Sequence, residues 1–439
     1  MATLVFPLSR IEGHAQVTIA VQDGQVQSAH FQATELRGFE YFVLGTPAEQ
    51  MPVIVPRICG VCSTAHHVAA VKALEMAFGV TPPPLAVRVR ELLMLGQLIQ
   101  NQATSLFIFT MPDRLGLTSI FAAAEGGGAR AEDERAAIAP RALQVRKAGT
   151  DLITLAGGQF IHPVKAVVGG VTSGIPATAA AAAREGLARA LPVACDLFEI
   201  YWEMSLRLRE RIGTWGDDMP AHYIAAVGER RPNYYGDRIR LLCPDGRLCD
   251  TFDAADFRQH LTLEQPDYSY AGQTSYQGEV LRANSLARIN MADEMGTPRA
   301  DAYLTRFREA FGRPAHAILL FDLARGIELV YALERALEML AEPLDGAKTA
   351  RPYRPRDGEG YGLVEAPRGP LIHHYRIERG LIAQAEFIIP TVHNMRAIER
   401  ALRVAAERYI SAERIDLELE RAVGRVVRAF DPCIACATH

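Results

Sequence analysis

Two pairs of cysteines near opposite ends of the 439-residue chain could hold a metal ion. Cys59 and Cys62 form one Cys-x-x-Cys pair, and Cys433 and Cys436 form the other. Two intervening residues let both thiolates of a pair reach one ion, so the two pairs can supply four sulfur ligands. Structural zinc and a redox dithiol are alternative uses of the same spacing. A zinc knuckle keeps its pairs close in sequence, whereas here the chain ends must meet around a shared site.

His66 follows the first pair and could tune it. It lies four residues after Cys62, near enough to donate a hydrogen bond to a thiolate without binding the metal. The alternative is a helix-cap histidine with no chemical role. Ser63 or Thr64 can cap a helix here, because apolar residues recur at helical spacing up to Gly79. We therefore expect the first cysteine pair to precede a helix N-terminus.

Helices dominate the structure expected around these cysteines. Periodic apolar residues predict long helices at roughly 85–111, 131–156, 178–212, 298–312, 315–341 and 391–429. Alternating residues and an Asp23-Gly24 turn predict a β hairpin region within residues 1–45. Turn residues in 235–280 and 343–370 indicate loops or short strands. The expected fold class is mainly α with a small N-terminal β sheet (α+β), a helical body around a buried metal site. We expect a single domain spanning 1–439, because the termini must meet.

Composition and charge exclude several classes of function. The 47 Lys and Arg against 51 Asp and Glu leave a net charge of −4, so no basic field is present to bind nucleic acid. The uncharged stretch 92–112 is long enough to cross a bilayer, but its amide and hydroxyl side chains favour a buried helix. From the first residues we expect no export signal, and seven cysteines, an odd number, suit a reducing compartment. We expect a cytoplasmic protein without direct membrane insertion.

The residues around both cysteine pairs resemble the two signatures of nickel–iron hydrogenase large subunits. Five motifs occur in the family's order and span nearly the whole chain: residues 9–14 (SRIEGH), 37–40 (RGFE), 57–66 (RICGVCSTAH), 365–369 (EAPRG) and 431–439 (DPCIACATH). The resemblance implies the fold of that family and a nickel ion joined to an iron that carries cyanide and carbon monoxide. Such an enzyme splits dihydrogen heterolytically, sends the proton to a nearby base, and passes electrons to an iron–sulfur small subunit.

The resemblance also assigns roles at the metal. Cys59 and Cys433 would be terminal nickel ligands, while Cys62 and Cys436 would bridge to the iron; soft, strongly donating sulfur suits both tasks. Glu12 occupies the position of the proton gate. Without the family, Glu12 would more simply be an ion-pair partner for Arg10.

Further residues match positions around the iron. Arg368 aligns with the arginine that lies over the open coordination position and hydrogen-bonds a cyanide ligand, with Pro367 packing beside it. The alternative for Arg368 is a surface arginine in a Pro-Arg-Gly turn. Asp431 would be its charge partner, and Thr391 matches a hydroxyl that faces cyanide.

A magnesium site and a maturation step also follow from the resemblance. Glu40 and the terminal His439 would bind Mg²⁺ together with a backbone carbonyl near Phe387. The alternative is a solvated carboxylate at Glu40, since imidazole is an unusual partner for so hard a cation. A chain that ends at His439 agrees with a maturation protease that removes a C-terminal extension once a nickel chaperone has delivered nickel.

Three segments resemble the cytosolic, multisubunit branch that includes the NAD-reducing and bidirectional enzymes: residues 95–100, 160–163 and 169–171. This branch implies partner subunits with flavin and further iron–sulfur clusters, and an acceptor such as NAD or ferredoxin. Residues 101–105 (NQATS) depart from the acidic, hydroxyl or histidine residues of relatives. The Gly358-x-Gly360-x-Gly362 stretch lacks the strand-to-helix setting of a dinucleotide loop, so we expect no NAD on this chain.

Other interpretations remain open on the residues alone. A dihydrogen-sensing regulatory subunit would use the same ligands with slow turnover. A structural zinc protein with four cysteine ligands would need no iron, and a related quinone-reducing respiratory subunit would need no metal. Cys195, Cys243 and Cys249 match no motif, and we expect ordinary buried thiols there.

Overall fold

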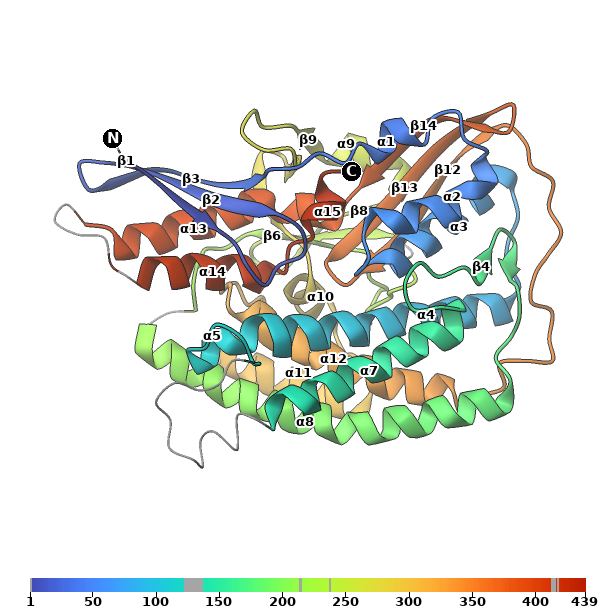
Figure 1. Ribbon diagram of the computed structural model, residues 1–439, viewed down its shortest axis with the longest axis horizontal. Helices are drawn as coiled ribbons and strands as arrows, with labels where there is room; N and C mark the ends of the chain where they lie inside the picture. The colour runs from blue at the N-terminus through green and yellow to red at the C-terminus, as the bar shows by residue number, and fades with distance from the viewer. Residues whose placement is uncertain (1, 122–136, 213–214, 237, 412–415, 417) are drawn as a thin grey trace.

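The computed structural model describes residues 2–121, 137–212, 215–236, 238–411, 416 and 418–439. Most of the long helices lie together on one side of the molecule, and the sheets, the helices that pack on them and both chain ends lie on the other (Figure 1). One hydrophobic cluster extends from Ala15 near the start to Ala437 near the end, so both ends contribute to the same core. None of the helices among these described residues is long and apolar enough to cross a membrane.

The helices follow the sequence periodicity closely in the first three quarters of the chain. Their bounds are α1 Phe39–Phe42, α2 Met51–Ile54, α3 Ser63–Phe78, α4 Pro84–Ala103, α5 Met111–Leu115, α7 Ile138–Gly157, α8 Ala177–Ile212, α9 Phe257–His260, α10 Ser285–Met291, α11 Pro298–Phe311, α12 Leu320–Met339, α13 Met395–Tyr409, α14 Glu418–Phe430 and α15 Ile434–Ala437. A π-helical stretch, Thr104–Thr110, joins α4 to α5. A helix was predicted at 131–156. Its first six positions, 131–136, lie outside the described residues.

The strands form four sheets among the described residues, more β structure than the small N-terminal sheet we expected. Their bounds are β1 Ala2–Pro7, β2 Ala15–Gln22, β3 Gln25–Ala33, β4 Ala166–Val167, β5 Gly170–Val171, β6 His222–Ala225, β7 Ile239–Leu242, β8 Leu248–Phe252, β9 Thr262–Glu264, β10 Gln273–Tyr276, β11 Glu279–Arg282, β12 Gly358–Ala366, β13 Gly369–Glu378 and β14 Leu381–Ile388. At the N-terminus β2 and β3 pair antiparallel across Asp23-Gly24, and both turn residues have positive φ, as a two-residue hairpin turn requires.

The prediction of loops or short strands at 343–370 was incomplete, because β12 and β13 form a long antiparallel hairpin there. Glycine is normally depleted from strands, which hid β12 from sequence analysis. A Cβ on Gly362 would lie 1.9 Å from the carbonyl oxygen of Ala69, and one on Gly360 would lie 2.0 Å from that of Ala73. Glycines two apart on a strand advance about 6.6 Å, close to the 6 Å between helix residues four apart. The glycines therefore let α3 pack directly onto β12.

The single helix predicted at 391–429 is also wrong, because two helices occupy this region. Helix α13 ends at Tyr409, and the next residue, Ile410, has an extended backbone. A new helix, α14, begins where the Asp416 carboxylate accepts the backbone N–H of Glu418. An acidic side chain that accepts such an N–H starts a helix by satisfying one of its free donors. The two helices pack against each other.

The turn-rich region 235–280, where we expected loops or short strands, contains short strands. They belong to a six-stranded sheet of order β8-β7-β6-β11-β10-β9, in which β11 and β6 pair in parallel and the other neighbours are antiparallel. Strand β8 lies at one edge of this sheet. The sheet and the β12–β13 hairpin both lie on the side of the molecule that carries the chain ends (Figure 1).

Candidate metal centre

The four paired cysteines come together in the core. Cys433 Sγ lies 2.7 Å from Cys436 Sγ and 3.4 Å from Cys59 Sγ, and Cys62 Sγ lies 2.8 Å from Cys436 Sγ. All four sulfurs are buried and lie within 4.8 Å of one another. Bonds of about 2.3 Å to a central metal ion would place its sulfur ligands roughly 3.8 Å apart. The arrangement is thus a four-thiolate metal site built from both ends of the chain.

The first pair is positioned by the start of α3. Cys62 itself is the N-cap residue of α3, and its backbone N–H points at Cys59 Sγ, 3.4 Å away. The expected caps, Ser63 and Thr64, make no such bond. Instead Gln97 of α4 accepts the backbone N–H of Ala65 at 2.7 Å. The helix N-terminus is therefore satisfied from a neighbouring helix, which ties α4 to the metal ligands.

The second pair is positioned by the N-terminal segment. The backbone N–H of Ile434 donates to the carbonyl of Glu12 at 3.0 Å, and Glu12 and Cys433 form an isolated parallel β-bridge. Gly13 has a φ of +82°, and a Cβ there would lie 2.9 Å from the backbone nitrogen of Ala435. Only glycine combines this backbone conformation with so close an approach. The two ends of the chain are thus held together by direct backbone contact.

The Glu12 side chain contacts the expected metal ligand Cys433 and does not pair with Arg10. Its Oε2 lies 3.0 Å from Cys433 Sγ and accepts the backbone N–H of Ala435 at 3.1 Å. Arg10 pairs with Asp113 at 2.6 Å instead, so the simple Arg10–Glu12 ion pair is wrong. Burial raises the pKa of Glu12, and the nearby Cys59 thiolate raises it further. A carboxyl with a raised pKa beside a metal ligand can act as a proton acceptor.

Arg368 lies in the turn between β12 and β13 and is buried against the C-terminal segment. Its Nη2 donates to Asp431 Oδ1 at 3.1 Å, and its Nε donates to the Asp431 carbonyl oxygen. Burial opposes its charge, but Asp431 and the cysteine thiolates outweigh burial and raise the pKa of Arg368. A surface position for this arginine is therefore wrong. Its Nη1 has no hydrogen-bond partner among the described residues.

Asn101 of α4 completes the contacts of Asp431. Its Nδ2 donates to Asp431 Oδ2 at 3.1 Å, so the Asp431 carboxylate is held on both oxygens. Asn101 belongs to the segment in which the sequence departs from the acidic, hydroxyl or histidine residues of relatives. An amide here donates to Asp431, whereas a second carboxylate would repel it. Sequence analysis singled out the segment but assigned no contact to Asn101.

His66 begins a buried chain of hydrogen bonds. Its Nε2 lies 3.4 Å from Cys436 Sγ, its Nδ1 lies 2.9 Å from His373 Nε2, and His373 Nδ1 lies 2.7 Å from the Tyr375 hydroxyl. Burial lowers the pKa of His66 to about 4 and lowers that of His373 as well, so both rings are neutral. The chain can then run in one direction, with the hydroxyl donating to His373, His373 to His66 and His66 to the sulfur. His373 had no signal in the sequence.

A small cavity adjoins Cys62, Cys433 and Cys436. Arg368 and its neighbour Pro367 line it, together with apolar residues and Thr391: Ala366, Leu371, Ile389 and Pro390. Thr391 Oγ1 accepts the backbone N–H of Cys433 at 3.0 Å. The cavity thus combines an apolar wall, a hydroxyl and a free guanidinium donor beside three of the sulfurs.

The residues expected to bind magnesium also meet. Glu40 Oε1 lies 3.2 Å from His439 Nε2 and accepts the backbone N–H of Phe387 at 2.8 Å. His439 Nδ1 lies 2.8 Å from the carbonyl oxygen of Cys436, which joins this group to the second cysteine pair. The solvated carboxylate considered for Glu40 is therefore wrong, because this side chain has specific partners.

A buried ionic cluster lies behind Arg368, and sequence analysis missed it. Arg288 donates to Glu365 Oε1 at 2.6 Å and pairs with Glu328 at 2.5 Å, and Glu328 also accepts from Gln102 at 2.6 Å. One guanidinium thus faces two carboxylates. Burial raises the pKa of Glu365 to about 7, against the opposing effect of Arg288. The only sequence signal was the position of Glu365 in the motif that contains Arg368.

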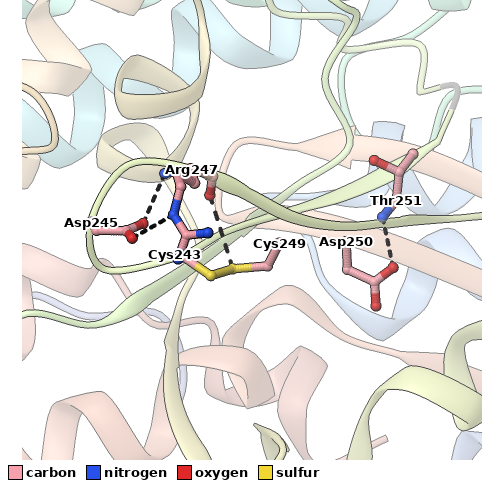
Figure 2. Close-up of a disulfide and its surroundings, with 6 residues drawn as sticks. All are labelled: Cys243, Asp245, Arg247, Cys249, Asp250 and Thr251. Atoms are coloured by element: carbon pink, nitrogen blue, oxygen red, sulfur yellow. Dashed lines mark hydrogen bonds and ion pairs between the residues drawn. A yellow bond between two sulfur atoms is a disulfide. The ribbon is translucent and has the colours of Figure 1, made fainter.

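The expectation that Cys243 and Cys249 are ordinary buried thiols is wrong. The structure pairs them in a disulfide across the Pro-Asp-Gly turn between β7 and β8 (Figure 2). Both residues are half-buried. The antiparallel hairpin brings them together, so the turn that sequence analysis recognised is also what closes the bond. Cys195 on α8 remains a free, half-buried cysteine.

The residues present fit a nickel–iron centre on the chemistry of the donor set. Four thiolates are the ligands that a soft or borderline metal ion prefers, and no carboxylate or imidazole competes within that group of four. The free Nη1 of Arg368 is a buried donor beside the cavity, as a small hydrogen-bonding ligand on iron requires.

Comparisons with known proteins give the family. A sequence model described as nickel-dependent hydrogenase matches residues 37–134 and 221–439, and one described as HoxL-like matches residues 4–36. One relative comes from the F420-non-reducing hydrogenase vhu of Methanococcus voltae; it is 34% identical over 412 residues, covering 92% of this chain and 97% of that protein. NAD-reducing hydrogenase HoxS subunit beta of Cupriavidus necator is 30% identical over 463 residues, covering 99% and 93%.

Solved structures agree with this family. A crystal structure of a NAD+-reducing NiFe hydrogenase in the H2-reduced state matches with a TM-score of 0.92 at 29% identity, over 100% of both chains. A NiFeSe hydrogenase of Desulfovibrio vulgaris Hildenborough shares the fold, with a TM-score of 0.83 at 22% identity, over 100% of this chain and 99% of that one.

The fold and the four-thiolate site therefore define a metal-dependent oxidoreductase that acts on dihydrogen. The chain belongs to the nickel-dependent hydrogenase family, and it is similar to large subunits of that family over almost its whole length.

Proposed function

We propose that this chain is the catalytic subunit of a nickel–iron hydrogenase, which converts dihydrogen reversibly into two protons and two electrons. The observation that carries the proposal is the meeting of four buried sulfurs with Glu12 and a free Arg368 donor. Cys59 and Cys433 would bind nickel alone, and Cys62 and Cys436 would bridge nickel to iron. The bound centre supplies the electron-pair acceptor for heterolysis of dihydrogen.

Glu12 is the proton acceptor in this proposal. Its Oε2 lies 3.0 Å from Cys433 Sγ, so a proton on this sulfur has one short step to the carboxylate. The neighbouring residues Gly13 and His14 are exposed, which places Glu12 between the buried sulfurs and the surface of the chain. The backbone N–H of Ala435 holds the accepting oxygen in place.

Arg368 orients and polarises whatever occupies the cavity. Asp431 holds two sides of its guanidinium, so the free Nη1 has a defined direction. A fixed charge in an apolar pocket acts strongly because little water is present to screen it. Arg368 and Thr391 would hold cyanide on the iron by hydrogen bonds, and Pro367, which also lines the cavity, would pack beside it.

A magnesium ion at Glu40 and His439 is part of the same proposal. Glu40 Oε1 and His439 Nε2 already lie 3.2 Å apart, and the backbone N–H of Phe387 donates to the same carboxylate oxygen. Mg²⁺ would draw the C-terminal residue toward α1 and so hold the segment with the second cysteine pair.

An iron–sulfur small subunit is the partner that would take the electrons. Gly60, between the first two cysteines, is exposed, so the metal-binding loop reaches the surface. Large apolar side chains are exposed in residues 36–53, the segment that precedes this loop in the sequence, and we call them the loop patch: Leu36, Tyr41, Phe42, Leu44 and Val53. Arg37 bonds the carbonyl of Ile58 and so joins the loop patch to the metal-binding loop. Exposed apolar groups of this size mark protein interfaces.

Further features stay predictions at this level. Relatives are named as subunits of NAD-reducing and F420-non-reducing hydrogenases, which supports additional electron-transfer subunits, with or without flavin. Processing after His439 by a maturation protease, nickel delivery by a chaperone, and a cytoplasmic location complete the proposal.

Metal analysis and spectroscopy of the purified complex test the proposal. We expect one nickel per large subunit, more iron than nickel because the small subunit adds iron–sulfur clusters, infrared bands from cyanide and carbon monoxide, and dihydrogen-dependent dye reduction. Cys59→Ser removes a terminal ligand and should abolish nickel binding and activity, while Cys195→Ser, a matched change on α8, should change neither. Zinc as the only metal would contradict the proposal.

The dihydrogen-sensing alternative predicts the same metals with very slow turnover and a signalling partner. The steady-state rate of the intact complex, measured with an artificial acceptor, separates a sensor from an enzyme. No geometric feature of the described residues favours the sensor.

A further inference from the structure

A second group of metal-binding side chains lies at the edge of the six-stranded sheet. His222 on β6, Cys243 after β7 and Cys249 on β8 offer one nitrogen and two sulfur atoms that all lie within 4.8 Å of one another. All three residues are half-buried, and β8 is an edge strand, so solvent and ions can reach them. None of the motifs shared with hydrogenases includes these residues.

The pairing of the strands explains why three ligands meet. Tyr223 pairs with Leu242 in the antiparallel register of β6 and β7, so the next position brings His222 opposite Cys243. Side chains directly opposite in such a pair lie about 5 Å apart on the same face. The register of β7 and β8 then shifts between Leu241 and Leu242, and this bulge makes Cys249 the additional residue. Bulges commonly redirect one side chain in this way.

The turn between the cysteines is held by its own hydrogen bonds. The backbone N–H of Cys243 donates to Arg247, and that of Gly246 donates to Cys243, at 2.8 and 2.9 Å. Asp245 pairs with Arg247 at 2.6 Å (Figure 2). These bonds do not use the sulfur atoms, so the turn can keep its shape when the disulfide is opened. Two thiolates and an imidazole on a preformed turn match three of the four ligands of a tetrahedral zinc site.

We infer that His222, Cys243 and Cys249 form a second metal site, which binds a borderline-soft divalent cation such as Zn²⁺ when the cysteines are reduced and is closed by the disulfide when they are oxidised. Zinc binding releases the two thiol protons and leaves the fourth position to water. Closure by a low-molecular-weight disulfide breaks the reagent's S–S bond and forms the Cys243–Cys249 bond. Two electrons pass from the protein thiols to the reagent, whose two sulfurs leave as thiols with the two protons.

Zinc content of the metal-loaded complex tests this site. The complex is reduced with a phosphine, incubated with Zn²⁺ alone, desalted and analysed for metals. We expect one more zinc per large subunit than in the same complex oxidised with a small disulfide. Cys249→Ser and His222→Ala should lose this zinc, and Cys195→Ser, which removes a cysteine outside the cluster, should keep it. Dihydrogen turnover of each variant reports whether the complex is intact.

Alkylation of the wild-type complex gives an independent readout that needs no variant. After reduction, Zn²⁺ should protect Cys243 and Cys249 from N-ethylmaleimide in peptide mass spectra, with no change at Cys195. No additional zinc in the reduced complex, or equal zinc in wild type and Cys249→Ser, would show that the pair is only a disulfide staple and would overturn the inference.

Discussion

At the scale of single residues, Glu12 and Arg368 differ in how they are held. One carboxylate oxygen of Glu12 contacts Cys433 Sγ and accepts the backbone N–H of Ala435. The side chain is half-buried, so a proton on Glu12 can leave. Arg368 is buried with two of its donors on Asp431, so its charge cannot move away from the sulfurs. A mobile proton and a fixed charge are the two properties that heterolysis of dihydrogen requires.

Glu12→Gln should remove proton transfer and keep the metal site. Glutamine can still accept the Ala435 N–H but cannot take up a proton, so we expect turnover to fall by about 10²–10⁴-fold. Nickel content and the infrared bands of the iron ligands should stay as in the wild type. Glu35→Gln, an exposed carboxylate near His14, is the matched control and should keep full turnover. Unchanged turnover in Glu12→Gln would remove Glu12 from the mechanism.

Glu365 should make the stability of the protein depend on pH. Its pKa is raised from 4.5 to about 7 by burial, so the folded chain keeps a proton that the unfolded chain releases. The stabilisation is present in full below pH 4.5 and is lost as the pH rises to about 7, in total about 3 kcal/mol of unfolding free energy.

The variant Glu365→Gln stays neutral throughout this range, so its stability should be flatter with pH than that of the wild type. Thermal unfolding midpoints measured across the window give the comparison. Glu309→Gln, an exposed carboxylate on α11, should follow the wild-type curve. Parallel curves for the wild type and Glu365→Gln would contradict the raised pKa.

At the scale of elements, the contact between α3 and β12 aligns the two halves of the site. Cys62 caps the start of helix α3, and the strand β12 leads into the turn that carries Arg368. The glycines of β12 lie against the carbonyls of Ala69, Ala73 and Ala77 on α3. The distance between the first cysteine pair and Arg368 therefore depends on how closely a helix approaches a strand.

Gly362→Ala should separate these two elements. The added Cβ would lie 1.9 Å from the Ala69 carbonyl oxygen, and a backbone atom in a packed helix cannot move aside cheaply. Overpacking of this kind costs about 1–3 kcal/mol and often more, so we expect a lower unfolding midpoint and a reduced nickel content. Gly186→Ala is the same chemical change in α8, where the added Cβ would meet nothing within 4 Å. This control should stabilise the folded protein by about 0.5–1 kcal/mol. A wild-type midpoint for Gly362→Ala would refute the close packing.

The elements also show where sequence patterns succeed. Helices such as α8 and α11 were predicted to within one residue at each end because their apolar periodicity is uninterrupted. The pattern over 391–429 continues across two helices, since both present an apolar face to the core, and the break depends on the extended Ile410. Strand β12 was not predicted because its glycines are there for close packing against α3, and local strand propensity does not report packing.

At the scale of the whole molecule, the site exists only because the two chain ends meet. Glu12 and Cys433 are 421 residues apart in sequence and 3.0 Å apart in space. Gly60 and the residues of the loop patch are exposed, and we propose that they form the surface that meets the small subunit. The short loop from Cys59 to Cys62 thus combines buried metal ligands with an exposed residue through which electrons would leave.

Polar substitution of the loop patch should weaken association with the small subunit. Tyr41→Ser with Phe42→Ser removes two side chains that are 79% and 67% exposed and that gain most from burial against a partner. We expect less small subunit to copurify with the chain, with the metal content of the remaining complex unchanged. Leu248→Ser, an exposed apolar residue on β8, is the matched control. Full association of the double variant would place the interface elsewhere.

The amino-acid sequence was sufficient for the class of chemistry and for most helices. Cysteine spacing limits which metals can bind, and the motifs around Cys59 and Cys433 carry the family, because ligand identity and helical periodicity are local properties of the chain. Only the tertiary structure showed the partners of those ligands: Asn101 on Asp431, His373 on His66, and Arg288 between two carboxylates. These contacts join residues far apart in sequence, and whether a buried polar group finds its partner is decided by packing, which no local pattern records.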